Sequence, residues 1–198
     1  MTDYSHLPTE QHPFLPFLPE GAKLLMLGSF PPKPEKWSMP FFYPNWINDM
    51  WRIWGYLYFG NKQHFEIPGK KQFDQEKIIS FCTTQGIALY DTATAIRRLK
   101  NNASDQFLEV ITPTDILTLL KQLPYCQAIV TTGEKATDIL VENWHCEKPS
   151  IGSMTTLHLN NRTFHFWRMP SSSRAYPLSL EKKATFYQKM LNFEQIKN

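Results

Sequence analysis

Residues 23–54 read KLLMLGSFPPKPEKWSMPFFYPNWINDMWRIW, and the rest of the chain is organised around this stretch. It opens with an apolar run, 23–27, that predicts a short and fully buried strand. Five prolines between positions 31 and 44 then exclude regular structure up to about residue 45, because proline restricts its own backbone and that of the residue before it. A helix should follow, since apolar residues occupy positions 47, 50, 51 and 54 with helical spacing.

The loop between this strand and this helix is rich in aromatic side chains, namely Phe30, Trp37, Phe41, Phe42 and Tyr43. Leaving that much apolar area in water is unfavourable, so the rings either fold back onto the core or form a rigid slot for a flat molecule. In a parallel sheet such a loop lies at the carboxyl ends of the strands, where ligands bind. We expect a mixture, in which one or two rings face a pocket.

The remaining chain alternates between short apolar strands and amphipathic helices. We expect further strands at 87–90, 128–132, 155–159 and 162–168. We expect helices at 74–85 with Gly86 as C-cap, from the start signal Thr112–Asp115 to about 123, at 134–144, and at about 180–193 after Ser179. Asn160–Asn161, between the last two strands, is typical of a hairpin turn. The pattern predicts an α/β fold, a three-layer α/β/α sandwich around a mostly parallel four-stranded sheet.

The length and composition fit one folded domain over residues 1–198, with 42% hydrophobic and 20% charged residues. Residues 1–22 are rich in proline and predict an extended arm whose apolar side chains pack on the body. The net charge of +3 permits contact with nucleic acid without arguing for it. We expect a monomer.

Cysteine usage and hydropathy limit the class of protein. The three cysteines are far apart and form no C-x-x-C pair, so we expect no structural zinc and no iron–sulfur cluster. Free thiols favour a reducing compartment. The sequence shows neither a basic-then-apolar leader nor a stretch long enough to cross a bilayer, and this predicts a cytoplasmic protein without membrane contact.

Four groups of residues, each at an expected strand end, follow one another in a set order. The first is Gly28-Ser29-Phe30-Pro31 with Phe42-Tyr43, Asn48 and Met50-Trp51-Arg52; the second is Gly86–Asp91 with Arg97-Arg98 and Ser104-Asp105; the third is Thr132–Ala136; the fourth is Met169–Ser173 with Glu181-Lys182. Together they span about residues 24–190. In this order they resemble the uracil-DNA glycosylase superfamily, and most closely its hypoxanthine-DNA glycosylase family.

The resemblance implies excision of a damaged base from DNA by hydrolysis of its N-glycosidic bond, without cofactor or metal. In that family the catalytic asparagine lies on the helix after the first loop, at the position that matches Asn48. Several sister families instead carry their catalytic residue just after the first strand, where this chain has Ser29.

The chain departs from the family's pattern in and after the fourth group of residues. Arg174, Ala175 and Tyr176 follow its serines where the family continues into proline, alanine and asparagine, and Met169 stands where sister enzymes often have histidine.

Such a reaction sets requirements that these residues could meet. The nucleotide must be flipped out of the stack, and negative charge develops on the leaving base. Phe42 or Tyr43 could form the flat slot, because a stacked ring contributes ~1–3 kcal/mol per base. The backbone N–H groups of Gly28, Ser29 and Phe30 could donate hydrogen bonds to the base anion.

Asn48 has two possible roles. Its side-chain carbonyl could hold the attacking water, because a dissociative reaction needs positioning more than a strong base. Alternatively, Asn48 and Asn45 make local hydrogen bonds at the start of the helix. Spacing alone favours the local role, whereas the resemblance favours the catalytic one.

The other candidate residues also have alternatives. Asp91 could accept the ring N–H of uracil or hypoxanthine, or it could form an ion pair with Arg97 or Arg98, and we weigh these equally. The loop of Ser171, Ser172 and Ser173 could donate to phosphates on both sides of a flipped nucleotide, or it could be an ordinary turn. Arg174 or Tyr176 could fill the gap left in the base stack.

Two other functions remain open at this point. The first is a nucleic-acid-binding protein that keeps the slot for a base and lacks the chemistry. The departures from the family's pattern in and after the fourth group favour it. The second is a hydrolase of free nucleosides or nucleotides, and the lack of a glycine-rich phosphate loop counts against it.

Overall fold

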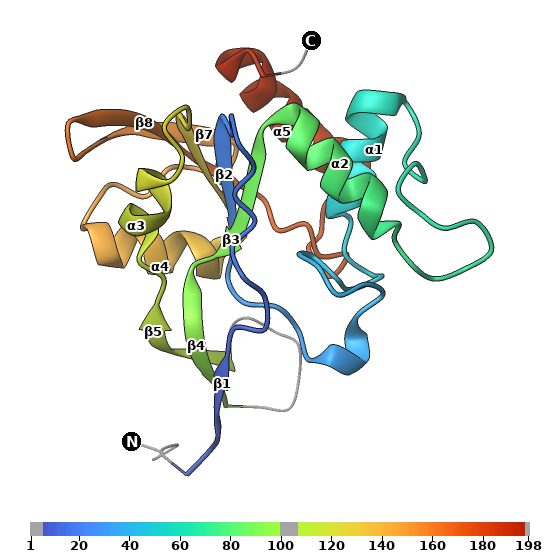
Figure 1. The fold of residues 1–198 in the computed structure, drawn as a ribbon, viewed down its shortest axis with the longest axis horizontal. Coiled ribbons are helices and arrows are strands. Elements are labelled where there is room, and N and C mark those ends of the chain that lie inside the picture. The colour runs from blue at the N-terminus through green and yellow to red at the C-terminus, as the bar shows by residue number, and fades with distance from the viewer. Residues whose placement is uncertain (1–5, 100–106, 197–198) are drawn as a thin grey trace.

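The computed structural model describes residues 6–99 and 107–196, which form five α-helices and two sheets (Figure 1). The elements in chain order are β1 (Thr9–Gln11), β2 (Leu24–Gly28), a 3-10 helix (Pro34–Lys36), α1 (Met50–Phe59), α2 (Gln75–Gln85), β3 (Ile87–Asp91), β4 (Ala93–Arg98), β5 (Leu108–Pro113), α3 (Ile116–Lys121), β6 (Ala128–Thr132), α4 (Glu134–Trp144), β7 (Ser153–Leu159), β8 (Arg162–Met169) and α5 (Leu180–Glu194). Ser104-Asp105, a pair that contributes to the family resemblance, lies outside the described residues.

The main sheet has the strand order β3-β2-β6-β8-β7. The first four strands run parallel, and β7 joins the edge antiparallel to β8. The prediction of four strands was therefore short by one, because both arms of the hairpin enter this sheet. Asn160 and Asn161 adopt φ angles of 48° and 62°, as the two central residues of a tight hairpin turn require.

The register of the parallel strands brings their carboxyl ends to one edge. Gly28 pairs with Asp91 across β2 and β3, and Thr132 pairs with Met169 across β6 and β8. The N–H of Gly133, the residue after β6, donates to the Met169 carbonyl at 3.1 Å. The expectation that the ends of β2, β3, β6 and β8 meet at one edge of the sheet is confirmed.

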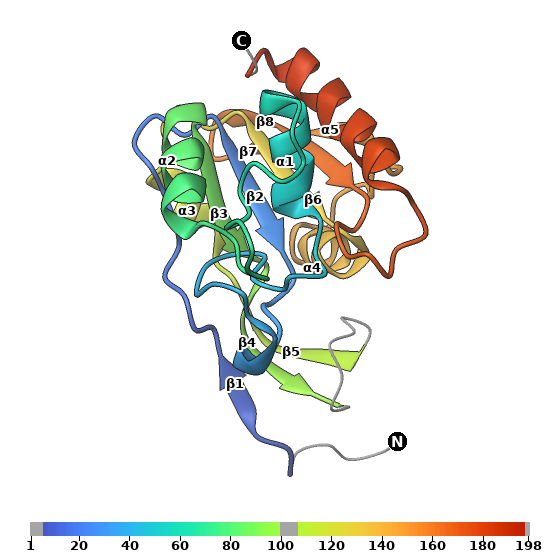
Figure 2. The same ribbon diagram turned by 90° about the vertical axis from the view of Figure 1, so that its right-hand side faces the viewer.

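Helices cover both faces of the main sheet. Figure 1 shows α1, α2 and α5 on one side and α3 and α4 on the other, and Figure 2 shows α1 and α5 side by side over the sheet. Every residue of β2, β3 and β6 is buried between these layers. Because full burial of a Leu or Ile side chain stabilises by about 1.5–3 kcal/mol, these strands hold the layers together.

A second, smaller sheet with the order β1-β4-β5 lies below the main one in Figure 1 and was not predicted. Strand β4 begins two residues after β3 ends, so the chain leaves the main sheet at Asp91 and immediately enters the small one. Strand β1, in the N-terminal segment, pairs antiparallel with β4. The backbone of Phe17 in the same segment exchanges hydrogen bonds with Leu89 of β3, at 3.0 and 2.9 Å.

Two helix starts differ from the sequence predictions. Helix α1 begins at Met50. Ile47, which completed the expected apolar stripe, lies in the loop before it and is 56% exposed. Helix α3 begins after Asp115, whose side chain accepts the Thr118 N–H, while Thr112 belongs to β5. The predicted caps Gly86 of α2 and Ser179 of α5 are confirmed.

Within residues 6–99 and 107–196, no helix has the length and apolar character needed to cross a bilayer. Over the same residues, no group of three or more His, Cys, Asp or Glu side chains is placed to hold a metal ion.

Candidate active site

The chain turns sharply where β2 and β3 end, beside the first loop. The carbonyl of Gly28 accepts hydrogen bonds from the N–H and the hydroxyl of Thr92, at 2.8 and 3.1 Å. A Cβ atom on Gly28 would overlap Oδ1 of Asp91 and would lie 3.7 Å from the ring of Tyr43. The absence of a side chain at Gly28 therefore lets the Asp91 carboxylate lie over the end of β2, next to Tyr43.

The buried carboxylate of Asp91 has a partner that the sequence analysis did not find. Its Oδ2 lies 2.9 Å from Nε2 of His12, in the N-terminal segment. The alternative of an ion pair with Arg97 or Arg98 was wrong, because both arginines pair with glutamates of the small sheet. A single histidine in a proline-rich arm has no spacing that could have identified this role.

The aromatic side chains of the loop have separate surroundings. Phe42 is buried in the main core, Phe30 is buried in a smaller cluster under the second sheet, and Ser29 between the strand and the loop is also buried. Tyr43 is only partly buried, and its φ of 50° is unusual for a residue with a side chain. Its hydroxyl lies 2.9 Å from Oγ1 of Thr132, so this ring links the ends of β2 and β6.

Asn48 lies two residues before α1, whereas the family resemblance implied a position on that helix. Its side-chain Oδ1 accepts the N–H of Met50 at 2.9 Å, and its own N–H donates to the Asn45 carbonyl. Arg52 holds the same segment from α1, because its Nη1 donates to the carbonyls of Trp46 and Asn48 at 2.8 and 3.0 Å. The local role is thus present, and the second lone pair of the amide oxygen can still accept a hydrogen bond.

The segment that contains Asn48 is paired with the loop after β8. Asn48 and Ser173 form an antiparallel backbone bridge. It is flanked by a hydrogen bond from the Asp49 N–H to the Ser172 carbonyl, 2.8 Å, and by one from the Arg174 N–H, 3.2 Å, to the residue before Asn48. The structure therefore joins two loops that are far apart in the sequence.

A buried cluster of charges fixes the same junction. The carboxylate of Asp49 lies 2.9 Å from Nε of Arg174, 3.3 Å from Nζ of Lys183 and 3.9 Å from Arg52. The side chain of Lys183, on α5, is 1% exposed, and its Nζ also donates to the Ser173 carbonyl at 2.8 Å. One carboxylate thus holds α5, the second loop and the start of α1 together.

Arg52 is enclosed on several sides. Its guanidinium lies 4.4 Å from the centre of the Trp46 ring and 5.0 Å from that of Phe73, and it pairs with Glu66. Burial and the nearby charge of Arg174 lower the pKa of Arg52, and Glu66 partly offsets this. Because it is packed against rings and carbonyls, Arg52 orients the loop and is poorly placed to contact solvent or ligand.

Sequence reasoning missed Asp49 and Lys183 as well, although Lys183 carried a signal. It lies on the core face of α5, with Ala184 and Tyr187 buried beside it. A lysine on an apolar helix face must have a partner, because burying an unpaired charge is costly.

The serine loop makes local hydrogen bonds of its own. Oγ of Ser171 accepts the N–H of Ser173 at 3.3 Å, and Oγ of Ser173 accepts the N–H of Ala175 at 3.2 Å. Ser172 is buried. Each accepting hydroxyl keeps its own O–H for donation, so Ser171 and Ser173 can still act as donors. Arg174, which was expected to contact DNA, has a side chain that is 45% exposed and held by Asp49.

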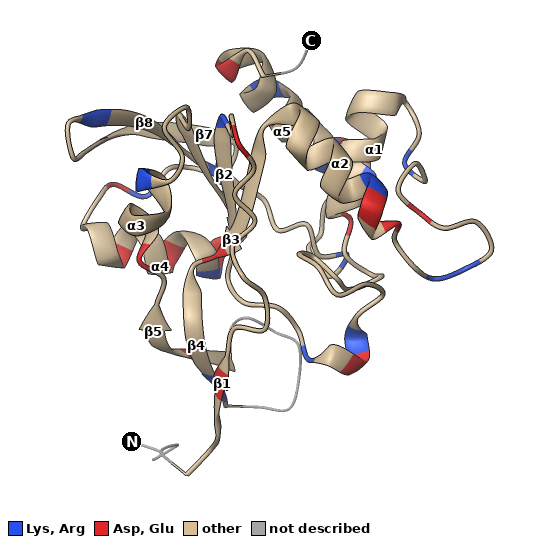
Figure 3. Ribbon diagram, viewed as in Figure 1, with Lys and Arg blue, Asp and Glu red and all other residues tan. Residues whose placement is uncertain are grey.

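Basic side chains are spread over several elements (Figure 3). Lys70 and Lys71 lie in the long loop between α1 and α2, next to a hollow of about 450 Å³. From the sequence we predict that the loop of residues 171–174 and some of Lys62, Lys70, Lys71 and Arg97 face one DNA-binding groove. Arg97 is paired with Glu109 on the small sheet. Whether the lysines and the serine loop share one DNA-binding groove remains a prediction.

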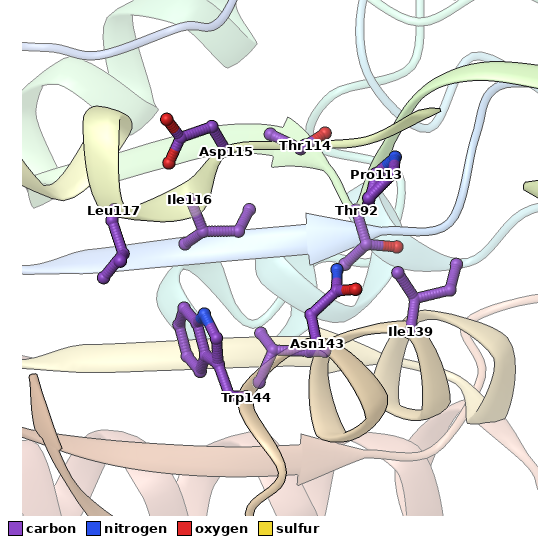
Figure 4. A pocket seen from close by; sticks show the side chains of 10 residues that line it. Thr92, Pro113, Thr114, Asp115, Ile116, Leu117, Ile139, Asn143 and Trp144 are labelled. Atoms are coloured by element: carbon purple, nitrogen blue, oxygen red, sulfur yellow. The ribbon is translucent and has the colours of Figure 1, made fainter. Parts of the chain in front are cut away.

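A separate hollow of about 340 Å³ lies between α3 and α4, on the opposite side of the main sheet from α1 (Figures 1 and 4). Trp144 and Asn143 line it from α4, and Ile116 and Leu117 line it from α3. None of the predicted site residues line it. Thr92, which bonds to the Gly28 carbonyl where β2 and β3 end, also lines this hollow.

Comparisons with known proteins show a similarity of fold to solved structures. No protein-family model matches this chain, and no curated protein sequence matches it. A solved structure does: the solution NMR structure from Methanosarcina acetivorans described as a "putative Uracil DNA glycosylase". The two chains are 22% identical with a TM-score of 0.59, over 89% of this chain and 96% of the other. This protein therefore shares the fold of that structure.

Proposed function

We propose that this protein is a DNA glycosylase that hydrolyses the N-glycosidic bond of a flipped, deaminated base, uracil or hypoxanthine, in DNA. The observation that carries the proposal is the backbone bridge between Asn48 and Ser173, which joins the segment before α1 to the loop after β8. It joins the first and the fourth of the groups of residues that resemble the superfamily. The fold shared with the structure described as a "putative Uracil DNA glycosylase" supports the same function.

On the base side, the flipped ring lies against Tyr43 at the end of β2. Asp91 is acceptor-only when ionised, so its Oδ1 accepts the ring N–H that uracil and hypoxanthine both present. The N–H groups from Gly28 to Phe30 donate to the base as negative charge develops on it. Of the two candidate rings for the slot, Phe42 is buried in the core, so the proposal assigns the slot to Tyr43.

On the sugar side, Asn48 holds the attacking water. Its amide oxygen already accepts the Met50 N–H, and this hydrogen bond fixes the direction of the second lone pair. Arg52 fixes the backbone of the same residue. The side chain is therefore held in advance of the reaction, and in a dissociative reaction such positioning supplies most of what a weak base lacks.

The serine loop binds the DNA backbone. Ser171 and Ser173 each donate a hydroxyl hydrogen to a phosphate oxygen next to the flipped nucleotide. Ser172 contributes through the backbone, because its carbonyl accepts the Asp49 N–H and so keeps the loop beside Asn48. Arg174 adds positive charge at the edge of this loop while Asp49 holds its Nε.

The test is incubation of the protein with DNA duplexes that contain a single uracil, hypoxanthine or xanthine, followed by alkali, which cleaves the strand at an abasic site. We expect cleavage at uracil or hypoxanthine, and none in the unmodified duplex. If no lesion is excised while the lesion duplexes still bind, the protein is a nucleic-acid-binding relative without the chemistry. If free deoxyuridine or deoxyinosine is hydrolysed and the duplexes are not, the substrate is a nucleoside.

A further inference from the structure

We propose that His12 is a positioning residue for base recognition, so that the N-terminal segment completes the base site by orienting Asp91. This inference rests on the proposed function. It concerns a residue outside every motif that the sequence analysis found, and His12 acts through Asp91 without touching the base.

The first observation is the hydrogen bonding of the imidazole. Nε2 of His12 lies 2.9 Å from Oδ2 of Asp91, while Nδ1 lies 3.1 Å from the Phe14 nitrogen and 2.9 Å from the Phe14 carbonyl oxygen. In the neutral ring, Nδ1 accepts the Phe14 N–H and Nε2–H donates to Asp91. In the charged ring, Nδ1–H donates to the Phe14 carbonyl instead. The Nε2–H donor to Asp91 is present in both states, so the ring can hold the carboxylate in either.

The second observation is how tightly the imidazole is enclosed. Its ring centre lies 4.6 Å from that of Tyr90, 5.2 Å from that of Phe30 and 5.9 Å from that of Phe14. The side chain of His12 is 2% exposed, whereas that of Asp91 is 9% exposed. Both side chains are thus buried, and the carboxylate is the more exposed of the two.

The third observation is the direction of the other carboxylate oxygen. With Oδ2 held by His12, Oδ1 lies directly over Gly28, on the side where the Tyr43 ring lies. That is the place where the proposed function puts the flipped base. An ionised carboxylate held in this orientation presents an acceptor and no donor, so it favours a base with a ring N–H over one with a bare ring nitrogen at that position.

The segment that carries His12 is fixed at both ends. The N–H of His12 donates to the Thr94 carbonyl at 2.8 Å, next to the β1–β4 pairing, and Phe17 pairs with Leu89 of β3. These backbone hydrogen bonds to β3, which ends at Asp91, and to β4, which begins two residues later, fix the position of the imidazole. A rigid support of this kind is what orientation of the carboxylate requires.

The experiment compares His12→Phe, His12→Gln and the control Gln11→Ala, each in the parent and in an Asp91→Ala background. Phenylalanine keeps the ring packing and removes the N–H, whereas the Nε2 of glutamine can still donate to Asp91. Gln11 is exposed and pairs through its backbone, so its side chain should not matter. The measurements are single-turnover excision from a uracil or hypoxanthine duplex, and affinity for the lesion duplex and for a duplex with a tetrahydrofuran abasic analogue.

We expect His12→Phe to slow excision on the order of 10- to 100-fold, because small misplacements of a binding group are that costly. His12→Gln should retain most of the rate, and Gln11→Ala should equal the parent. In the Asp91→Ala background, His12→Phe should change the rate by no more than about twofold, since nothing remains to be positioned. Affinity for the abasic analogue, which carries no base, should be unchanged in every His12 variant.

Two results would overturn the inference: an equal loss from His12→Phe in both backgrounds, or a fall in affinity for the abasic analogue that matches the loss of excision. Either would assign His12 a structural role only. If the parent excises no base, the proposed function fails separately. The inference is then decided by binding alone, where His12→Phe must weaken affinity for the lesion duplex and leave the abasic analogue unaffected, or it is wrong.

Discussion

The charge cluster that joins the two loops predicts how substitutions at Asp49 and Lys183 change the free energy of unfolding. Asp49→Ala removes the carboxylate that faces Lys183 and Arg174. Arg174 can turn to solvent, because its side chain is 45% exposed, but Lys183 is 1% exposed and would keep only the Ser173 carbonyl. Leaving a buried charge without its partner costs about 3–5 kcal/mol. Against a total stability of about 5–15 kcal/mol this is a severe loss.

Lys183→Met should cost less in the parent protein, about 1–3 kcal/mol. It removes two hydrogen bonds, but Asp49 keeps Arg174 at 2.9 Å, so no buried charge is left without a partner. In the Asp49→Ala background the sign should reverse: Lys183→Met should stabilise, because it removes the buried cation that has lost its carboxylate.

Urea unfolding of the four proteins, followed by tryptophan fluorescence, measures these free energies of unfolding. Excision by Asp49→Ala should also fall, because the Asn48–Ser173 bridge loses its support. If Lys183→Met destabilises both backgrounds equally, the two residues are not coupled and the cluster does not hold the loops together.

Three further predictions concern Gly28, the cysteines and the binding of DNA. Gly28→Ala should slow excision on the order of 10-fold and leave affinity for an abasic-analogue duplex unchanged, because the new Cβ displaces the Asp91 carboxylate; equal loss of both would contradict this. In the native protein, thiol reagents should modify Cys146 before Cys82 and Cys126. Burial raises the pKa of all three thiols, that of Cys126 to about 12, and Cys146 is the least enclosed. Mass spectrometry gives the order of modification, and unfolding in urea should abolish this order. Affinity for duplex DNA should fall steeply between about 50 and 200 mM salt, as released counterions require, and a salt-independent affinity would count against phosphate contacts.

Most of the main sheet could be predicted, because buried parallel strands are short apolar runs with distinct ends. The apolar runs 23–27 and 87–90 are of this kind, and the predicted helix caps Gly86 and Ser179 are clear signals. The small sheet could not be predicted from such signals. Its strand β4 is only half buried and follows β3 with one residue between them, so it reads as a continuation of a loop.

The candidate site was predictable only in outline. The strand ends and the two loops follow from topology, which brings Gly28 and Ser171 to one edge whatever their side chains do. The partners of Asp91 and Asp49 depend on contacts between segments far apart in sequence, and such contacts leave no periodic pattern. Ile47 shows the opposite failure: it fits the helical spacing, yet it lies in the loop and is exposed.

The central claim, that Asn48 holds water for glycosidic hydrolysis, is tested most directly by single-turnover excision with a matched pair of variants. Asn48 and Asn45 both use Oδ1 to accept the N–H two residues on, at 2.9 and 3.1 Å, so Asn45→Ala controls for loss of that local hydrogen bond. We expect Asn48→Ala to lose on the order of 10²-fold in rate, ~2.7 kcal/mol, with lesion-duplex affinity nearly unchanged, and Asn45→Ala to stay close to the parent. Excision by Asn48→Ala at the parent rate, or an equal loss in Asn45→Ala, would contradict the account.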